Sequence, residues 1–166
     1  MNDDTAVLLF DVVERLERNI RTRDCPAIVA LQGESKLVLS DFDYLRDQAT
    51  AAAFERRAAV KAREVAVVRW VFAVPQIWRI TPSEVSARAV SNHPLREGEE
   101  EAITWMAYDR GDGVDYGRVA YTRRPSGEPV FAEPQVLTIG VRPAESTPGY
   151  TLLRALMDDH NGTTGT

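Results

Sequence analysis

The sequence predicts an α+β fold, a mainly antiparallel sheet (a meander) with two N-terminal helices and a short C-terminal helix packed on it. Residues 3–23 and 42–63 have helical apolar spacing, a long apolar run follows at 65–74, and four more extended runs lie between residues 85 and 141. Consecutive strands that follow helices are typical of helices packed on one face of an antiparallel sheet. No repeat or linker divides the chain, so we expect one domain, 1–160, and a flexible tail, 161–166.

Residues 65–74, VAVVRWVFAV, are predicted to form the central strand. Arg69 is the only charge in this run, and all other positions on both alternating faces are apolar. A strand with two apolar faces is covered on both, so we expect Trp70 and Phe72 to be buried. Pro75 is expected to end the strand. An alternative is one long helix from residue 42 to residue 74, but the valines and aromatics favour a strand.

The helices are predicted from their apolar stripes and their ends. Residues 3–23 carry apolar side chains at three- and four-residue intervals, with acids at the start and arginines toward the end. Pro26 ends this helix, and residues 27–39 are expected to form a hairpin around Gly33. Ser40 or Asp41 can cap the second helix, 42–63, and Thr147–Pro148 can start the last one, 149–159.

The later strands are expected around residues 85–89, 103–107, 119–121 and 137–141. The stretches between them, NHPLREGEEE, DRGDGVDYG and RPSGEPVFAEPQ, contain the residues that loops need. Their charged residues, including Glu99, Glu100 and Glu101, are therefore predicted to be solvated.

The free edges of the sheet are expected at residues 27–39 and 136–141, and an unpaired edge favours a two-fold homodimer.

Composition argues against several classes of function. The net charge of −5 makes nucleic acid an unlikely partner, and no apolar run approaches the length that spans a membrane. The acidic start differs from a secretory signal, and Cys25 is the only cysteine, so we expect a cytoplasmic protein without disulfides. Of 20 basic residues 18 are arginines, which can pair bidentately with carboxylates.

No motif predicts a cofactor, a metal or a reaction. In residues 109–115, DRGDGVD, the acids fall three apart rather than at the alternating spacing of a calcium loop, so a solvated turn without metal is expected. Cys25 could act as a nucleophile only if His93 folded beside it. The chain is therefore more consistent with a protein that is not an enzyme.

Arg69 is the residue that most needs an explanation, because a buried guanidinium must be paired. A structural ion pair is favoured, and the alternative is a pocket in which Arg69, with Trp70 and Trp105, meets an anionic ligand. The leading hypothesis is a binding or accessory protein that acts through protein–protein contact, including self-association. The alternative is a small-molecule pocket protein or enzyme built around Arg69.

Overall fold

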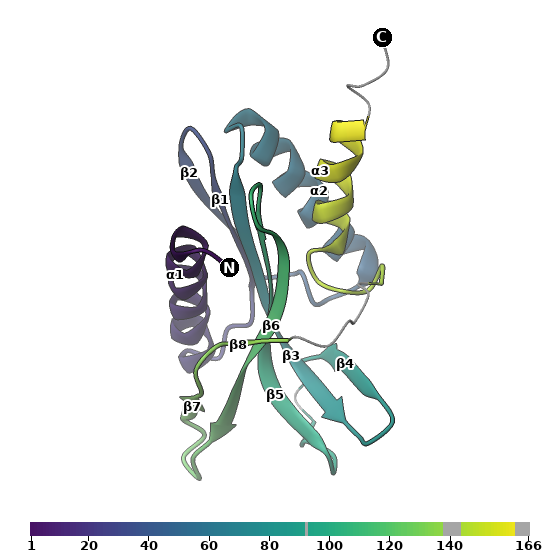
Figure 1. The fold of residues 1–166 in the computed structure, drawn as a ribbon. Helices are drawn as coiled ribbons and strands as arrows, with labels where there is room; N and C mark the ends of the chain where they lie inside the picture. The colour runs from purple at the N-terminus through teal and green to yellow at the C-terminus, as the bar shows by residue number, and fades with distance from the viewer. Residues whose placement is uncertain (92, 138–143, 162–166) are drawn as a thin grey trace.

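The computed structural model describes residues 1–91, 93–137 and 144–161. The elements in chain order are α1 (Asp3–Arg21), β1 (Ala27–Gln32), β2 (Lys36–Asp41), α2 (Gln48–Glu64), β3 (Arg69–Ile80), β4 (Val85–Ala89), β5 (Glu99–Asp109), β6 (Gly113–Arg123), β7 (Pro129–Phe131), β8 (Gln135–Val136) and α3 (Tyr150–Asn161). Figure 1 shows the long strands between α1 on one side and α2 with α3 on the other.

The described strands form one sheet in which every neighbouring pair is antiparallel. Its order is β2-β1-β3-β5-β6-β7, with β4 paired to β3 and β8 paired to β6. The predicted α+β class with an antiparallel sheet is therefore confirmed. The sheet has β2 at one edge and β7 at the other.

Helices cover both faces of the sheet, so the expected packing on one face is wrong. Leu9 and Leu16 of α1 pack with Val71 of β3, whereas Phe54 of α2 and Leu152 of α3 share a separate core with the opposite face. Because the central strands are apolar on both faces, one layer of helices would leave the other face in water. The expectation of two N-terminal helices is also wrong, since α2 lies in mid-chain between β2 and β3.

The central strand begins later and ends later than predicted. Residues 65–68 connect α2 to β3, and Ala66 has a positive φ of 50°, a conformation that ends the helix and excludes one long helix. Trp70 and Phe72 are fully buried, as expected. Pro75 does not end the strand, because on that edge β3 changes its neighbour between Ala73, the last residue paired with β1, and Gln76, the first paired with β4. The missing proline N–H is tolerated at such a gap.

Helices α2 and α3 and the first hairpin are present as predicted, but both helices begin and end at other residues than expected. The hairpin β1–β2 is confirmed. Helix α2 starts six residues after the predicted position, because Asp47, rather than Ser40 or Asp41, caps it by accepting a hydrogen bond from the Thr50 N–H (2.7 Å). Helix α3 covers Tyr150–Asn161, close to the predicted 149–159.

Three stretches that we expected to be loops contain strand residues. The acidic run is part of β5, where Glu99 pairs bidentately with Arg88 (2.7 and 3.0 Å) and Glu101 pairs bidentately with Arg123 (2.8 and 3.1 Å). These cross-strand pairs use arginine in the way its fork geometry favours. Strand β6 starts at Gly113, and RPSGEPVFAEPQ contains β7 and the start of β8. Of the predicted edge strand 136–141, residues 138–141 lie outside the described residues.

Candidate functional site

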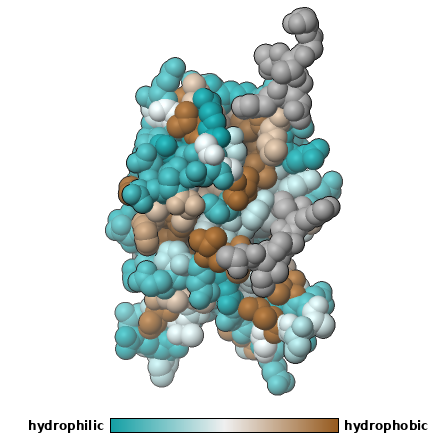
Figure 2. Space-filling view, viewed as in Figure 1, coloured by the Kyte–Doolittle hydropathy of each residue, from teal (hydrophilic) through white to brown (hydrophobic). Residues whose placement is uncertain are grey.

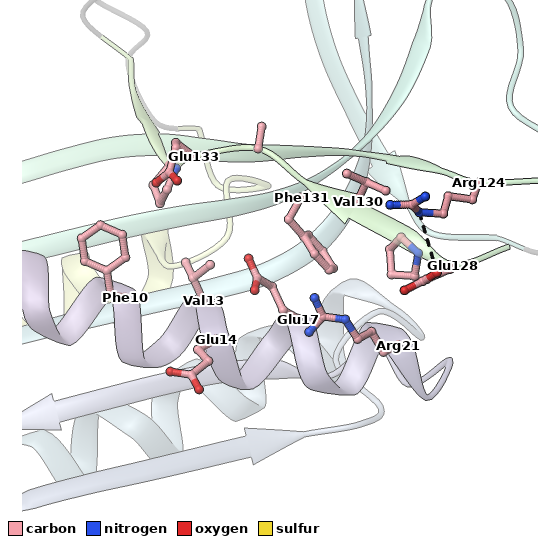
Figure 3. Close-up of a pocket in the computed structure, with 13 residues that line it drawn as sticks. Phe10, Val13, Glu14, Glu17, Arg21, Arg124, Glu128, Val130, Phe131 and Glu133 are labelled. Carbon is pink, nitrogen blue, oxygen red and sulfur yellow. Dashed lines mark ion pairs between the residues drawn. The ribbon is translucent and has the colours of Figure 1, made fainter.

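One concave surface beside the sheet is a groove between α1 and the chain segment that contains β7. We call it the α1–β7 groove (Figure 3). It has a volume of about 570 Å³. Figure 3 shows the side chains of Phe10, Val13 and Glu17 projecting from α1 toward this segment. The residues that line the groove are Phe10, Val13, Glu14, Glu17 and Arg21 of α1, together with Arg124 and the stretch 128–134.

The groove has an apolar rim that water reaches. Phe10 is 54% exposed on α1, and Val130 is 43% exposed on β7. Between them Phe131 is partly buried, with its ring 5.0 Å from that of Tyr121 and the Arg21 guanidinium 5.3 Å above its centre. Elsewhere, on the face shown in Figure 2, apolar side chains occupy small separate areas in a mainly hydrophilic surface. The groove thus combines exposed apolar groups with a fixed aromatic wall.

Strand β7 presents free backbone groups at the edge of the sheet. The N–H of Ala132 donates to the Ala120 carbonyl (2.9 Å), the Glu128 carbonyl accepts from the Arg124 N–H (2.9 Å), and Val130 lies opposite Thr122. Because backbone groups alternate in direction along a strand, the N–H and C=O of Phe131 point away from β6. Pro129 has a carbonyl but no N–H at the equivalent outward position.

The charges in the groove are mainly negative. Glu14, Glu17, Glu128 and Glu133 line it against the cations of Arg21 and Arg124. Partial burial raises the pKa of Glu17; Arg21 opposes this effect, while Glu14 and Glu133 add to it. The Arg124–Glu128 pair is exposed and long, at 3.7 Å. The surplus carboxylates would be stabilised by added positive charge.

Arg69 forms the structural ion pair that was favoured for it. Its Nε donates to Asp109 Oδ2 (3.1 Å) at the end of β5, and it also contacts Gln32 (3.3 Å) and Asp4 (3.5 Å). Burial acts against ionisation of Asp109, but hydrogen bonds from Asn2, the Gly111 N–H and Arg69 lower its pKa to about 2. The guanidinium of Arg69 thus already contacts three acceptor side chains, which leaves it little freedom to meet another anion.

The two candidate tryptophans lie on opposite faces of the sheet. Trp70 packs beneath α2 and α3, stacked on Tyr108 (5.9 Å between ring centres), at the wall of a 440 Å³ cavity. Trp105 belongs to the core under α1 and also reaches a 370 Å³ cavity beside β4. The indole N–H groups of both are buried and have no partner among the described residues. The structure does not bring Arg69, Trp70 and Trp105 together into one pocket.

The 370 Å³ cavity has the clearest polar arrangement of a small-molecule pocket. Trp78 Nε1 donates to Thr104 Oγ1 (2.8 Å), and Thr104 Oγ1 donates to Gln76 Oε1 (2.7 Å). Trp105 and Tyr116 complete an aromatic wall, and burial raises the pKa of Tyr116. The chain of hydrogen bonds fixes these side chains in one orientation.

The two residues considered for nucleophilic catalysis share a cavity. Cys25 and His93 line one cavity of 670 Å³, but burial raises the pKa of the Cys25 thiol, which opposes formation of a nucleophilic thiolate. Within the described residues, no group of three or more His, Cys, Asp or Glu side chains could hold a metal ion. In the same part of the chain, the helices are too short or too polar to cross a bilayer.

Comparisons with protein-family models, curated proteins and solved structures return no match for this chain. The sequence interpretation missed the α1–β7 groove because β7 was assigned to a loop. Two signals could have indicated it. Phe10 lies off the apolar stripe of α1, and Pro129-Val130-Phe131 is an apolar triplet within a polar, proline-rich stretch.

Proposed function

We propose that this protein is a binding protein that acts through contact with another protein, and that the α1–β7 groove is its contact surface. The observation that carries the proposal is the free edge of β7 beside the exposed side chains of Phe10 and Val130. A sheet edge supplies hydrogen-bonding groups in register, and a nearby helix supplies side-chain contacts. Burial raises the pKa of the Cys25 thiol, which argues against Cys25 as a competing nucleophile.

A peptide-library selection tests the proposal directly. Peptides selected on the wild-type protein are expected to shift the amide resonances of α1 and β7 and to lose binding to the Phe10→Ser variant. Phe42→Ser is the matched control, because Phe42 is an exposed phenylalanine that does not line the groove. Peptides that bind wild type and both variants equally, or a selection that yields no binders, would contradict the proposal.

The second candidate function is binding of a small neutral molecule beside β4. It is favoured by the hydrogen-bonded chain of Trp78, Thr104 and Gln76 at an aromatic wall. This candidate replaces the alternative of an anion pocket at Arg69, because Asp109 already pairs with that side chain. A fragment screen by NMR tests it. Hits that shift Trp78 and Thr104 but leave the α1 and β7 resonances unchanged would favour it.

We also propose self-association as a two-fold dimer through β2, at the edge opposite the groove. Strand β2 has six residues, and Leu37, Val38 and Leu39 are only partly buried. Such an edge can pair with its own copy. Sedimentation equilibrium is expected to give twice the 18.5 kDa chain mass, and a monomer mass at high concentration would refute the dimer. A cytoplasmic location is part of the proposal, supported by the lone cysteine.

A further inference from the structure

We propose that the segment bound in the α1–β7 groove is an extended, basic stretch of a partner protein that adds to the sheet as a strand beside β7. This inference rests on the proposed function, because it names the chemistry of the partner at the same surface. It follows from the backbone of β7, from the charges that line the groove and from the placement of its apolar groups.

The backbone of β7 can accept one short strand. Phe131 offers an outward N–H and an outward carbonyl, and Pro129 offers a further carbonyl two residues earlier. An antiparallel partner residue opposite Phe131 would exchange two hydrogen bonds with it. The partner residue opposite Pro129 can donate a third bond but has no N–H to accept from. Addition of an extended peptide to a free edge is an established mode of recognition.

The charges select a basic segment. Glu17 projects into the groove from α1. Its pKa is raised by partial burial and by the neighbouring carboxylates of Glu14 and Glu133. Arg21 is the nearest cation, and its guanidinium lies over the Phe131 ring. A lysine or arginine side chain between Glu17 and Glu133 would offset their mutual repulsion in a partly desolvated place, where charge pairs are stronger than on an open surface.

The side-chain pattern of the partner also follows. Phe131 packs with the core under α1, so a partner residue directly opposite it would project toward α1 as well. Residues two positions away project to the same side. Figure 3 shows Phe10 and Glu133 at one end of the groove and Glu17 farther along. A basic residue near Glu17 and an apolar residue two positions away, near Phe10, would therefore fit.

A second copy of this chain fits the groove less well. A two-fold pairing of β7 with itself would place one mainly acidic groove beside another. Like charges across such an interface are unfavourable. The groove is therefore assigned to a different protein, and self-association is assigned to β2.

The experiment uses five synthetic nine-residue peptides with acetylated and amidated ends. The first has the sequence Val-Val-Arg-Arg-Val-Val-Arg-Arg-Val, so that residues two positions apart are one basic and one apolar; the second replaces arginine by glutamate, and the third replaces it by serine. The fourth is the arginine peptide with N-methyl groups on the alternate residues whose N–H groups point to one edge, so that it keeps its charge but cannot pair as a strand on that edge. The fifth, its control, carries the N-methyl groups on the other edge. Binding is followed by amide resonances of the full-length, isotope-labelled protein.

We expect the arginine peptide to bind with a dissociation constant below about 1 mM and to shift Phe131 and Glu17. The glutamate peptide is expected to bind at least about tenfold more weakly. N-methylation on one edge, but not on the other, is expected to weaken binding by a similar factor. Glu17→Gln together with Glu133→Gln should reduce affinity for the arginine peptide and leave that for the serine peptide unchanged. Glu64→Gln with Glu84→Gln, an exposed pair outside the groove with the same charge change, should have a smaller effect.

The outcomes separate this inference from the proposed function. Equal binding of the arginine, serine and glutamate peptides at the groove would overturn the basic partner but keep a protein-binding groove. Equal binding of both methylated peptides would overturn strand addition in the same way. If none of these peptides shifts groove resonances while library peptides do, the inference fails alone. If library peptides also fail, the proposed function fails with it.

Discussion

The carboxylate of Glu55 in α2 accepts a hydrogen bond from the backbone N–H of Leu152 in the first turn of α3 (3.2 Å). Glu55 is 2% exposed, and its other oxygen accepts from the Tyr44 hydroxyl (2.8 Å). The N–H groups of Gly149 and Thr151 also approach this carboxylate. An acid from another helix thus satisfies the amide groups that are unpaired at the start of α3. Glu55 therefore links α2 directly to the start of α3.

The pH dependence of stability should report on Glu55. Burial raises its pKa above the ordinary 4.5, although the hydrogen bonds from Tyr44 and Leu152 oppose this shift. The folded protein therefore binds the Glu55 proton more tightly than the unfolded chain does, so stability is lost as the pH rises from 4.5 through the folded pKa. Urea titrations should show the unfolding free energy of wild type falling relative to Glu55→Gln over that range. A difference that is constant, or that changes in the opposite direction, would contradict the assignment.

Removing the hydroxyl partner of Glu55 should destabilise the protein. Tyr44→Phe leaves a buried carboxylate oxygen without its donor, so we expect a loss of about 2 kcal/mol in unfolding free energy at neutral pH. Tyr108→Phe is the control, because Tyr108 is a partly buried tyrosine on the same face without a hydroxyl bond to Glu55. Equal small losses in both variants, measured by urea titration, would show that the Glu55 contact is not important.

Gly117 on β6 should tolerate no side chain. A Cβ at this position would overlap the backbone oxygen of Gln135 in β8 and the indole ring of Trp105. Gly117→Ala is therefore expected to cost about 3 kcal/mol or more. At Gly113 a Cβ would meet nothing within 4 Å, but φ is 81°, so Gly113→Ala should cost only about 1 to 2 kcal/mol of backbone strain. Thermal and urea unfolding of the two variants compare these costs.

The Arg69–Asp109 pair should stabilise the fold. Arg69→Leu leaves Asp109, whose side chain is 10% exposed, without its guanidinium, and we expect a loss of about 3 kcal/mol at neutral pH. The folded pKa of Asp109 is about 2, below its ordinary 3.8, so its contribution is present above pH 3.8 and is lost as the pH falls through 2. The cost of the substitution should therefore decrease between those values. A cost that does not depend on pH would contradict the ion pair as its cause.

Elements with strong local patterns could be predicted from the sequence. Helix α1 was found because its stripe repeats over five turns, and the buried part of β3 was found because both of its faces are apolar. The Phe72 ring lies 5.4 Å from that of Tyr44 and 6.1 Å from that of Phe54. Neither partner could be named beforehand, because side-chain partners from separate segments are determined by packing rather than by spacing.

Features that depend on distant segments could not be predicted. A proline normally ends a strand. Pro75 is tolerated here because β1 pairs with β3 before it and β4 pairs with β3 after it. Glu99 and Glu101 looked solvated because their arginine partners are 11 and 22 residues away. Strand β7 has only three residues, too few for an alternating pattern, so the groove beside it was not visible in the sequence.

The exchange of neighbours along β3 divides this strand into two parts with different opening reactions. Residues from Arg69 to Ala73 lie between β1 and β5 and under helices, whereas residues from Gln76 to Ile80 lie between β5 and the mostly exposed strand β4. Figure 1 shows β4 extending beyond the helices. Local fluctuations can release β4 without disturbing either core. Deuterium should therefore enter the second part by local opening and the first part only when the whole protein unfolds, with Pro75, which has no amide, as the boundary.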